Sequence, residues 1–193
     1  AVLLASLSLS PVYASGAWFG ATLLTVLAVV AAGAVATWLR APVFLVPVIQ
    51  AVVMFAALVS RFTSDAPLGF LPTSDALDQL RAVLAEGVSD VDKFAPPIPV
   101  TEGDTAIAAL GMGCLAIIVF VLQVSLRMPV IAGLSLLAVY VVPALVLDDG
   151  APWWSFAFVA VGFMVLLVSD ERVGLASWGR MLRRSEGEAG SPL

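Results

Sequence analysis

The residue types that could carry chemistry are scarce in this sequence. It contains no histidine and a single cysteine, Cys114. Zinc sites built from His and Cys, and nucleophilic sites of the Ser-His-Asp or Cys-His kind, are therefore excluded within this chain. Cys114 stands beside Gly111 and Gly113 in an apolar stretch, where a small neutral residue is favoured over a reactive thiol. We expect no catalytic, cofactor-binding or metal-binding residue, and no cofactor.

Polar residues inside the apolar stretches are the next candidates. Ionisable side chains at membrane depth mark transport pathways because they are costly there, and the complete apolar stretches contain none. Gln50 is the best candidate for a ligand group, but an interhelical hydrogen bond, worth roughly 0.5–1.5 kcal/mol, is the favoured interpretation. Pro47 and Pro143 could mark the broken helices of transporters. Each lies near a helix end, so we interpret both as packing features.

Acidic residues form the third candidate group. They could hold Ca²⁺ or act as a carboxylate pair, but their spacing matches no regular ligand pattern. A solvated acidic face is the favoured interpretation. The residues are Asp90, Asp92, Glu102, Asp104, Asp148 and Asp149.

The composition indicates a membrane protein, in which these candidate residues would lie on or between helices. Of the 193 residues, 61% are hydrophobic and 12% are charged, whereas an ordinary soluble domain has about 45–50% and 25%. The mean hydropathy is +1.07. Charge-free runs of roughly 17 to 23 residues are long enough to cross the hydrocarbon layer as helices. We therefore predict an all-α, polytopic membrane helix bundle of about five to six transmembrane helices.

The predicted transmembrane domain covers 1–184. Its spans are 1–10 (partial), 17–39, 42–60, 105–126, 129–147 and 153–169. The first run begins without an initiator Met and is too short to span, so we expect it to be the second half of a helix. A truncated signal peptide with its apolar region at 3–9 is the alternative. The tail 185–193 is expected to be a polar linker or a cut end.

The basic residues predict the orientation, because Lys and Arg accumulate in short cytoplasmic loops. Six of the nine basic residues fall on one side: Arg40, Arg127, Arg172, Arg180, Arg183 and Arg184. The acidic loop 61–104 then lies on the extracytoplasmic side of the membrane. Tryptophan favours the membrane boundary, and all five fall at predicted span ends. They are Trp18, Trp38, Trp153, Trp154 and Trp178.

The outer loop contains a predicted amphipathic helix over 74–88. Ser74 or Thr73 can cap it after Pro72, and acidic residues occupy its first turn. Leucines and one valine recur at helical spacing along it: Leu77, Leu80, Leu84 and Val88. Gly87 is expected to end or weaken the helix. The helix should lie across the outer mouth of the bundle.

A second surface helix is predicted on the inner side over 171–184. Its apolar face would lie on the membrane, and its arginines would reach anionic headgroups. Nucleic-acid binding is the less favoured alternative for these arginines. The lipid bilayer is therefore the first expected partner, and no nucleic acid is expected.

Small residues indicate close helix packing. Gly16 and Gly20 form a small-xxx-small pair, and Gly111, Gly113 and Gly133 are expected to let helices approach one another.

Several segments resemble one bacterial family. They are 4–19 (LASLSLSPVYASGAWF), 69–74 (GFLPTS), 96–100 (PPIPV), 128–143 (MPVIAGLSLLAVYVVP) and 150–155 (GAPWWS). Together they resemble the N-terminal membrane domain of TgpA-type transglutaminase-like membrane proteins, in their actinobacterial form. The resemblance covers nearly the whole chain, but its motifs concern packing and loops, so no site residue is carried over.

The resemblance implies that a further span leads to an extracytoplasmic, papain-like domain with Cys, His and Asp. The parent would then be an enzyme of cysteine-protease or amide-transfer type, and this chain its non-catalytic membrane anchor or scaffold in the cell envelope. Its partners would be that domain of the same polypeptide and other membrane subunits. Two alternatives remain. A small transporter or permease subunit predicts a polar cavity near Gln50, Thr25 and Gln123, and an interaction subunit predicts an unpacked apolar or small-residue face.

Overall fold

The structure, a computed structural model, describes residues 1–11, 16–63, 74–93, 101–126, 128–146 and 152–168. All regular elements in these ranges are helices, which confirms the predicted all-α fold. The predicted inner helix 171–184 and the tail 185–193 lie outside the described residues. So do Asp148 and Asp149.

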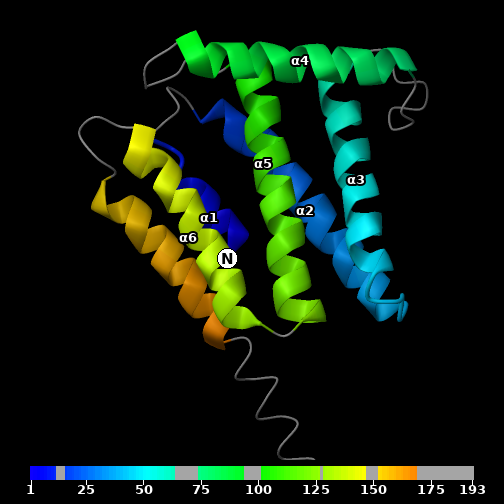
Figure 1. Ribbon diagram of the computed structural model, residues 1–193, viewed down its shortest axis with the longest axis vertical. Coiled ribbons are helices and arrows are strands. Elements are labelled where there is room, and N and C mark those ends of the chain that lie inside the picture. Colours follow the sequence, from blue (N-terminus) through cyan, green and yellow to red (C-terminus); the bar gives the residue numbers. More distant parts are fainter. Residues whose placement is uncertain (12–15, 64–73, 94–100, 127, 147–151, 169–193) are drawn as a thin grey trace, which may run out of the picture.

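The helices form two groups, and one further helix lies across the end of the first group (Figure 1). The first group holds α2, Ala17–Trp38; α3, Leu45–Phe62; and α5, Glu102–Phe120, which continues as the π-helix η1, Val121–Ser125. The second holds α1, Val2–Leu7; α6, Pro129–Val146; and the helix Trp153–Val168. The crossing helix is α4, Ser74–Lys93.

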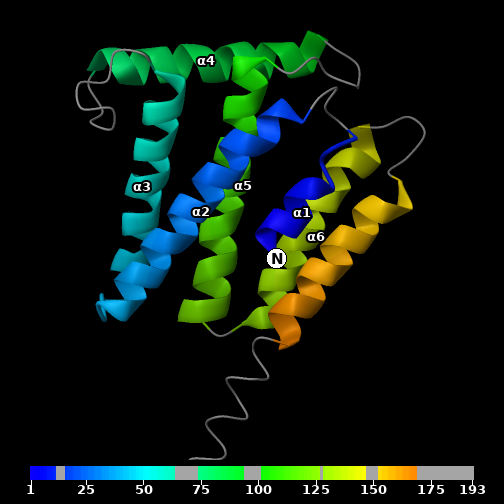
Figure 2. The same ribbon diagram turned by 180° about the vertical axis from the view of Figure 1, so that it is seen from behind.

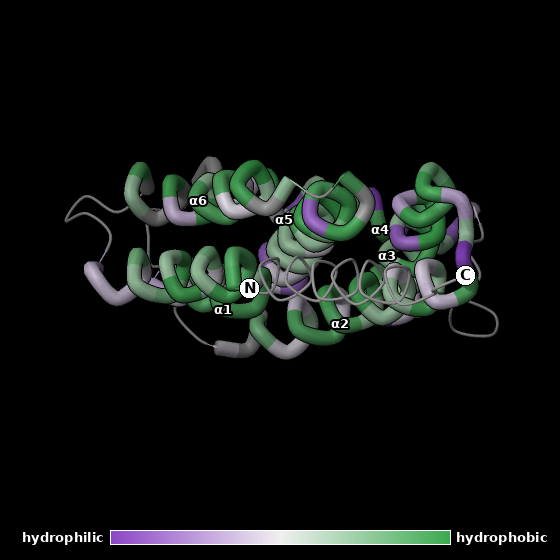
Figure 3. Tube along the Cα trace, turned by 90° about the horizontal axis from the view of Figure 1, so that it is seen from below, coloured by the Kyte–Doolittle hydropathy of each residue, from purple (hydrophilic) through white to green (hydrophobic). Residues whose placement is uncertain are grey.

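Three helices are long and apolar enough to cross a membrane: Trp18–Trp38, Leu45–Phe62 and Glu102–Val124. Two shorter apolar helices, Val130–Val141 and Trp153–Val168, accompany them. Large apolar side chains are exposed along these helices, and the tube of Figure 3 is mostly hydrophobic there. Such continuous apolar surface is expected where lipid replaces water. The chain is thus a membrane protein, while five to six spans stay a prediction.

Glycines set the contacts inside the first group. A Cβ added at Gly113 of α5 would lie 2.7 Å from Met54 Sδ of α3 and 3.3 Å from Thr25 Cγ2 of α2. Close approach of three helices at this point needs a residue without a side chain. The prediction for Gly113 is therefore confirmed.

The second group is joined by ring contacts. A Cβ on Gly133 of α6 would overlap the Phe163 ring, so the prediction for Gly133 is also confirmed. Tyr140 of α6 and Phe156 meet edge to face, with ring centroids 5.6 Å apart. Figure 2 shows the helix Trp153–Val168 running beside α6. In the second group, aromatic side chains therefore supply much of the contact between helices, whereas in the first group the helices meet at small residues.

The other predicted packing glycines do not pack. Among the described residues, Cβ atoms on Gly16, Gly20 and Gly111 would meet no atom within 4 Å. A small residue helps packing only where a neighbouring helix crosses at that residue, and local spacing does not predict where crossings occur. The expectation for these three glycines was wrong.

The crossing helix α4 is longer than predicted. It continues through Gly87 to Lys93 instead of ending near 88. Gly87 does not end the helix because it lies against Gly103 in the first turn of α5: a Cβ on either residue would come within 2.5 Å of the other's backbone. The buried line of α4 is accordingly Ala76, Leu80 and Gly87, whereas Val88 is 58% exposed.

The turn between α2 and α3 is held by backbone hydrogen bonds at the end of α2. Arg40 adopts a left-handed conformation with φ 57°. Its N–H donates to the Thr37 carbonyl at 3.0 Å, and that of Ala41 donates to the Ala36 carbonyl at 2.9 Å. This pair of bonds is the Schellman motif, which usually has glycine in the position of Arg40.

Candidate functional site

Gln50 of α3 is fully buried in the first group. Its Nε2 donates a hydrogen bond to the Val29 carbonyl of α2 at 3.2 Å, which confirms the predicted interhelical hydrogen bond. Gly33 of α2 leaves space for the Gln50 amide, since a Cβ on Gly33 would overlap the same nitrogen. The Oε1 atom is buried and has no hydrogen-bond partner among the described residues. Gln50 is thus held between packed helices.

The hydroxyl groups of Thr22 and Thr25 on α2 donate to carbonyls of their own helix. Thr25 Oγ1 donates to the Ala21 carbonyl at 3.0 Å, and Thr22 Oγ1 donates to the Trp18 carbonyl at 3.0 Å. Both threonines are buried. Such bonds satisfy a hydroxyl without help from a ligand. Trp18 is the first residue of the candidate span Trp18–Trp38, as predicted, and its side chain is buried against other helices.

Gln123 lies between the two groups. It belongs to η1, and its Nε2 donates to the Leu166 carbonyl at 3.4 Å. A cavity of about 270 Å³ adjoins it. The other lining residues are Ala1, Val2, Leu3, Val26, Leu27, Val30, Ala116, Val119, Phe120, Val124 and Leu166. This cavity is apolar apart from Gln123, so it does not unite the three polar residues that the transporter alternative requires.

The predicted packing prolines lie at helix ends. Pro47 is in the first turn of α3, where the missing N–H would have had no helical acceptor, and Pro143 is in the last turn of α6. Pro47 does not line the cavity at Gln123. Cys114 is a free, exposed cysteine on α5.

The acidic candidates lie on two helices. Asp90 and Asp92 belong to the last turns of α4, while Glu102 and Asp104 start α5. No group of three potential metal ligands occurs in the described ranges. Asp104 is 2% exposed and forms a capping box with Thr101: Thr101 Oγ1 accepts from the Asp104 N–H at 3.2 Å and donates to Asp104 Oδ2 at 2.9 Å. Its place is structural.

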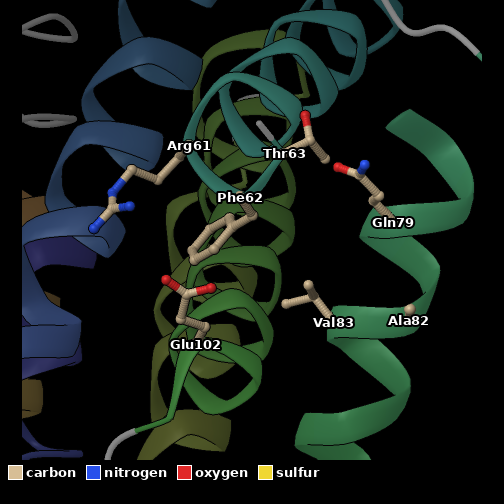
Figure 4. Close-up of a pocket in the computed structure, with 7 residues that line it drawn as sticks. All are labelled: Arg61, Phe62, Thr63, Gln79, Ala82, Val83 and Glu102. Carbon is tan, nitrogen blue, oxygen red and sulfur yellow. The ribbon is translucent and has the colours of Figure 1, made fainter. Parts of the chain in front are cut away.

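A recess with a polar lining lies where α3 ends, α4 crosses and α5 begins. Its volume is about 420 Å³. Figure 4 shows the seven lining residues, which are Arg61, Phe62, Thr63, Gln79, Ala82, Val83 and Glu102. We call it the headgroup-end recess. It combines a guanidinium, a carboxylate, an amide and a hydroxyl with an apolar wall, so it can bind a polar group.

Sequence reasoning missed this recess because its residues are far apart in the chain. Arg61 ends one apolar run and Glu102 precedes another, so their common level at the membrane edge could have been read from the sequence. Their proximity depends on α4, whose crossing position is set by Gly87 and Gly103. The prediction that the chain has no catalytic, cofactor-binding or metal-binding residue stays a prediction.

Comparison with protein families gives one match. The model of the TgpA N-terminal domain matches residues 1–188. A search of curated proteins and a search of solved structures each found no match. The family match covers nearly the whole chain and agrees with its apolar helices. The chain therefore belongs to the TgpA N-terminal domain family, the N-terminal membrane part of TgpA-type transglutaminase-like proteins.

Proposed function

We propose that this domain is a non-catalytic membrane anchor that fixes the height and orientation of a transglutaminase-like domain on the outer face of a bacterial cytoplasmic membrane. The observation that carries the proposal is the packed interior around Gln50, found in a chain of this family. Helices held at glycine crossings cannot slide past one another cheaply, so they transmit a defined position to the segments they carry.

The proposed topology places α4 and the loop 61–104 outside, and the C-terminal arginines inside. The excess of basic residues on one side supports this orientation. The five to six spans, the actinobacterial form and the linker role of 185–193 belong to the same proposal.

Cysteine labelling tests the topology. In a Cys114→Ser background, Glu86→Cys places a thiol on exposed α4, and Arg40→Cys places one in the turn after α2. An impermeant maleimide should label Glu86→Cys in intact cells and label Arg40→Cys only after the membrane is opened. Labelling in the opposite order would reverse the orientation.

A domain exchange tests the anchor function. In the full-length protein, residues 1–188 are replaced by an unrelated multi-pass anchor of the same orientation. The amide-transfer or protease activity towards a small soluble substrate, which can reach the enzyme at any height above the membrane, should then change by less than about twofold at equal membrane abundance, because an anchor contributes no group to the transition state. A large loss of activity with normal localisation would show that the domain does more than anchor.

A further inference from the structure

The headgroup-end recess holds two opposite charges that do not neutralise each other. Arg61 and Glu102 are both exposed, and neither forms an ion pair within the described ranges, where the one pair seen joins Arg81 and Asp78 on α4. The Arg61 guanidinium carbon lies 5.6 Å from the centroid of the Phe62 ring. In Figure 4 the Glu102 carboxylate points toward the same ring. An aromatic wall therefore has a cation and an anion beside it.

The recess lies at the edge of the apolar layer. Arg61 is the second-last residue of the candidate span Leu45–Phe62, and Glu102 is the first residue of the candidate span Glu102–Val124. Residues at these positions meet the headgroups of a bilayer, because the hydrocarbon region ends where the apolar stretch ends. The molecules present at that level in high concentration are phospholipids.

The apolar part of the wall suits the same ligand. Phe62 and Val83 line the recess together with the polar residues. Phe62 is 9% exposed and lies in the hydrophobic core cluster, so its ring is fixed by packing. A fixed ring beside Arg61 leaves the guanidinium with fewer conformations to lose when it binds an anion.

We propose that the headgroup-end recess binds a phospholipid whose headgroup carries a phosphate and a primary ammonium, such as phosphatidylethanolamine. Arg61 binds the phosphate, since a guanidinium donates two parallel hydrogen bonds to it. Glu102 accepts hydrogen bonds from the ammonium. A quaternary ammonium has no N–H to donate, so phosphatidylcholine loses this second contact. The inference rests on the membrane placement given under the proposed function.

Lipid titration of the purified, delipidated chain tests this proposal. Native mass spectrometry in detergent measures the affinity for phosphatidylethanolamine, phosphatidylcholine and phosphatidylglycerol with identical acyl chains. We expect phosphatidylethanolamine to bind about five- to tenfold more tightly than the other two, which corresponds to one charge-assisted hydrogen bond.

Two pocket variants and two matched controls assign the contacts. Arg61→Gln should weaken the affinity for all three lipids by about fivefold. Glu102→Gln should lower only the affinity for phosphatidylethanolamine, to the affinity measured for phosphatidylcholine. The controls are Arg81→Gln and Glu86→Gln, which remove an exposed guanidinium and an exposed carboxylate of α4 outside the recess. Both controls should bind the lipids as the wild type does. Helicity and elution volume confirm that each variant is folded.

Three outcomes would overturn the proposal. Equal affinity for phosphatidylethanolamine and phosphatidylcholine would show that Glu102 does not accept hydrogen bonds from the ammonium. A loss of affinity in Glu86→Gln as large as that in Glu102→Gln would show a general charge effect. Competition by free phosphoethanolamine at the concentration that the lipid needs would show that the recess recognises a soluble compound. None of these outcomes affects the domain exchange, so failure of the lipid site and failure of the anchor function are distinguishable.

Discussion

Helix crossings in this molecule use glycine in two different ways. At Gly33 and Gly113 the neighbours are ends of side chains, Gln50 Nε2 and Met54 Sδ. At the crossing of α4 and α5, Gly87 and Gly103 face each other's backbone. Side chains can move by a few tenths of an ångström, whereas backbone in a helix cannot. The crossing of α4 and α5 therefore tolerates less movement than the contacts at Gly33 and Gly113. The position of α4, and with it the headgroup-end recess, is the more strictly determined.

The largest effect is expected at the backbone crossing. Gly103→Ala puts a Cβ about 2.5 Å from the Gly87 nitrogen, which should destabilise the domain by about 3 kcal/mol because α4 must move away from α5. Thermal unfolding in detergent micelles measures the loss. The control is Gly111→Ala on the same helix, where the Cβ meets open space. An equally stable Gly103→Ala variant would refute the distinction between the crossings.

A smaller loss is expected at the side-chain crossing. Gly33→Ala should cost about 2 kcal/mol, because the new Cβ displaces Gln50 Nε2 from the Val29 carbonyl. In a Gln50→Ala background most of this cost should disappear. A double-mutant cycle on thermal stability measures the coupling. If the full cost remains, the ring of Phe120, 2.8 Å from that Cβ, causes the clash instead.

A third loss of stability is expected from removing the cap at the start of α5. Thr101→Ala removes the capping box with Asp104 and should cost about 1 kcal/mol. Thr101→Ser keeps a hydroxyl that can cap and serves as the control. Unfolding measurements on both variants would show no difference if the cap contributes nothing.

The smallest effect is expected at the turn between α2 and α3. Arg40→Gly should stabilise the domain by about 0.5 kcal/mol, because glycine adopts the left-handed conformation without strain while its unfolded chain is more flexible. Arg40→Ala keeps the strain and removes the charge, so it should not be stabilised. Higher stability of both variants would point to the charge as the cause.

The sequence allowed the helices to be predicted but not their crossings. Long charge-free runs predict α2, α3 and α5 because apolar length is a local property. The buried face of α4 was predicted as Leu77, Leu80, Leu84 and Val88, yet Gly87 is buried and Val88 is not. The prediction rested on the largest apolar side chains, whereas two helices that cross can approach closely only where their residues are small.

The candidate site was predicted only in part for the same reason. The hydrogen-bonding role of Gln50 could be predicted, since a lone amide in an apolar run needs a partner. The partner atom, the Val29 carbonyl, depends on the position of Gly33 on another helix. The recess at Arg61 and Glu102 depends on α4 in three dimensions, and no spacing in the sequence joins those residues.

The π-helix η1 after α5 has an evolutionary consequence. In this turn the Leu126 N–H donates to the Val121 carbonyl at 2.9 Å, five residues back. A π-turn holds one residue more than an α-turn, so it accommodates a single inserted residue without changing the helix before it. Loss of one residue from 121–125 would restore a regular helix and rotate Gln123 away from Leu166. We therefore expect one-residue insertions and deletions among homologues to gather at this turn, where the two helix groups meet.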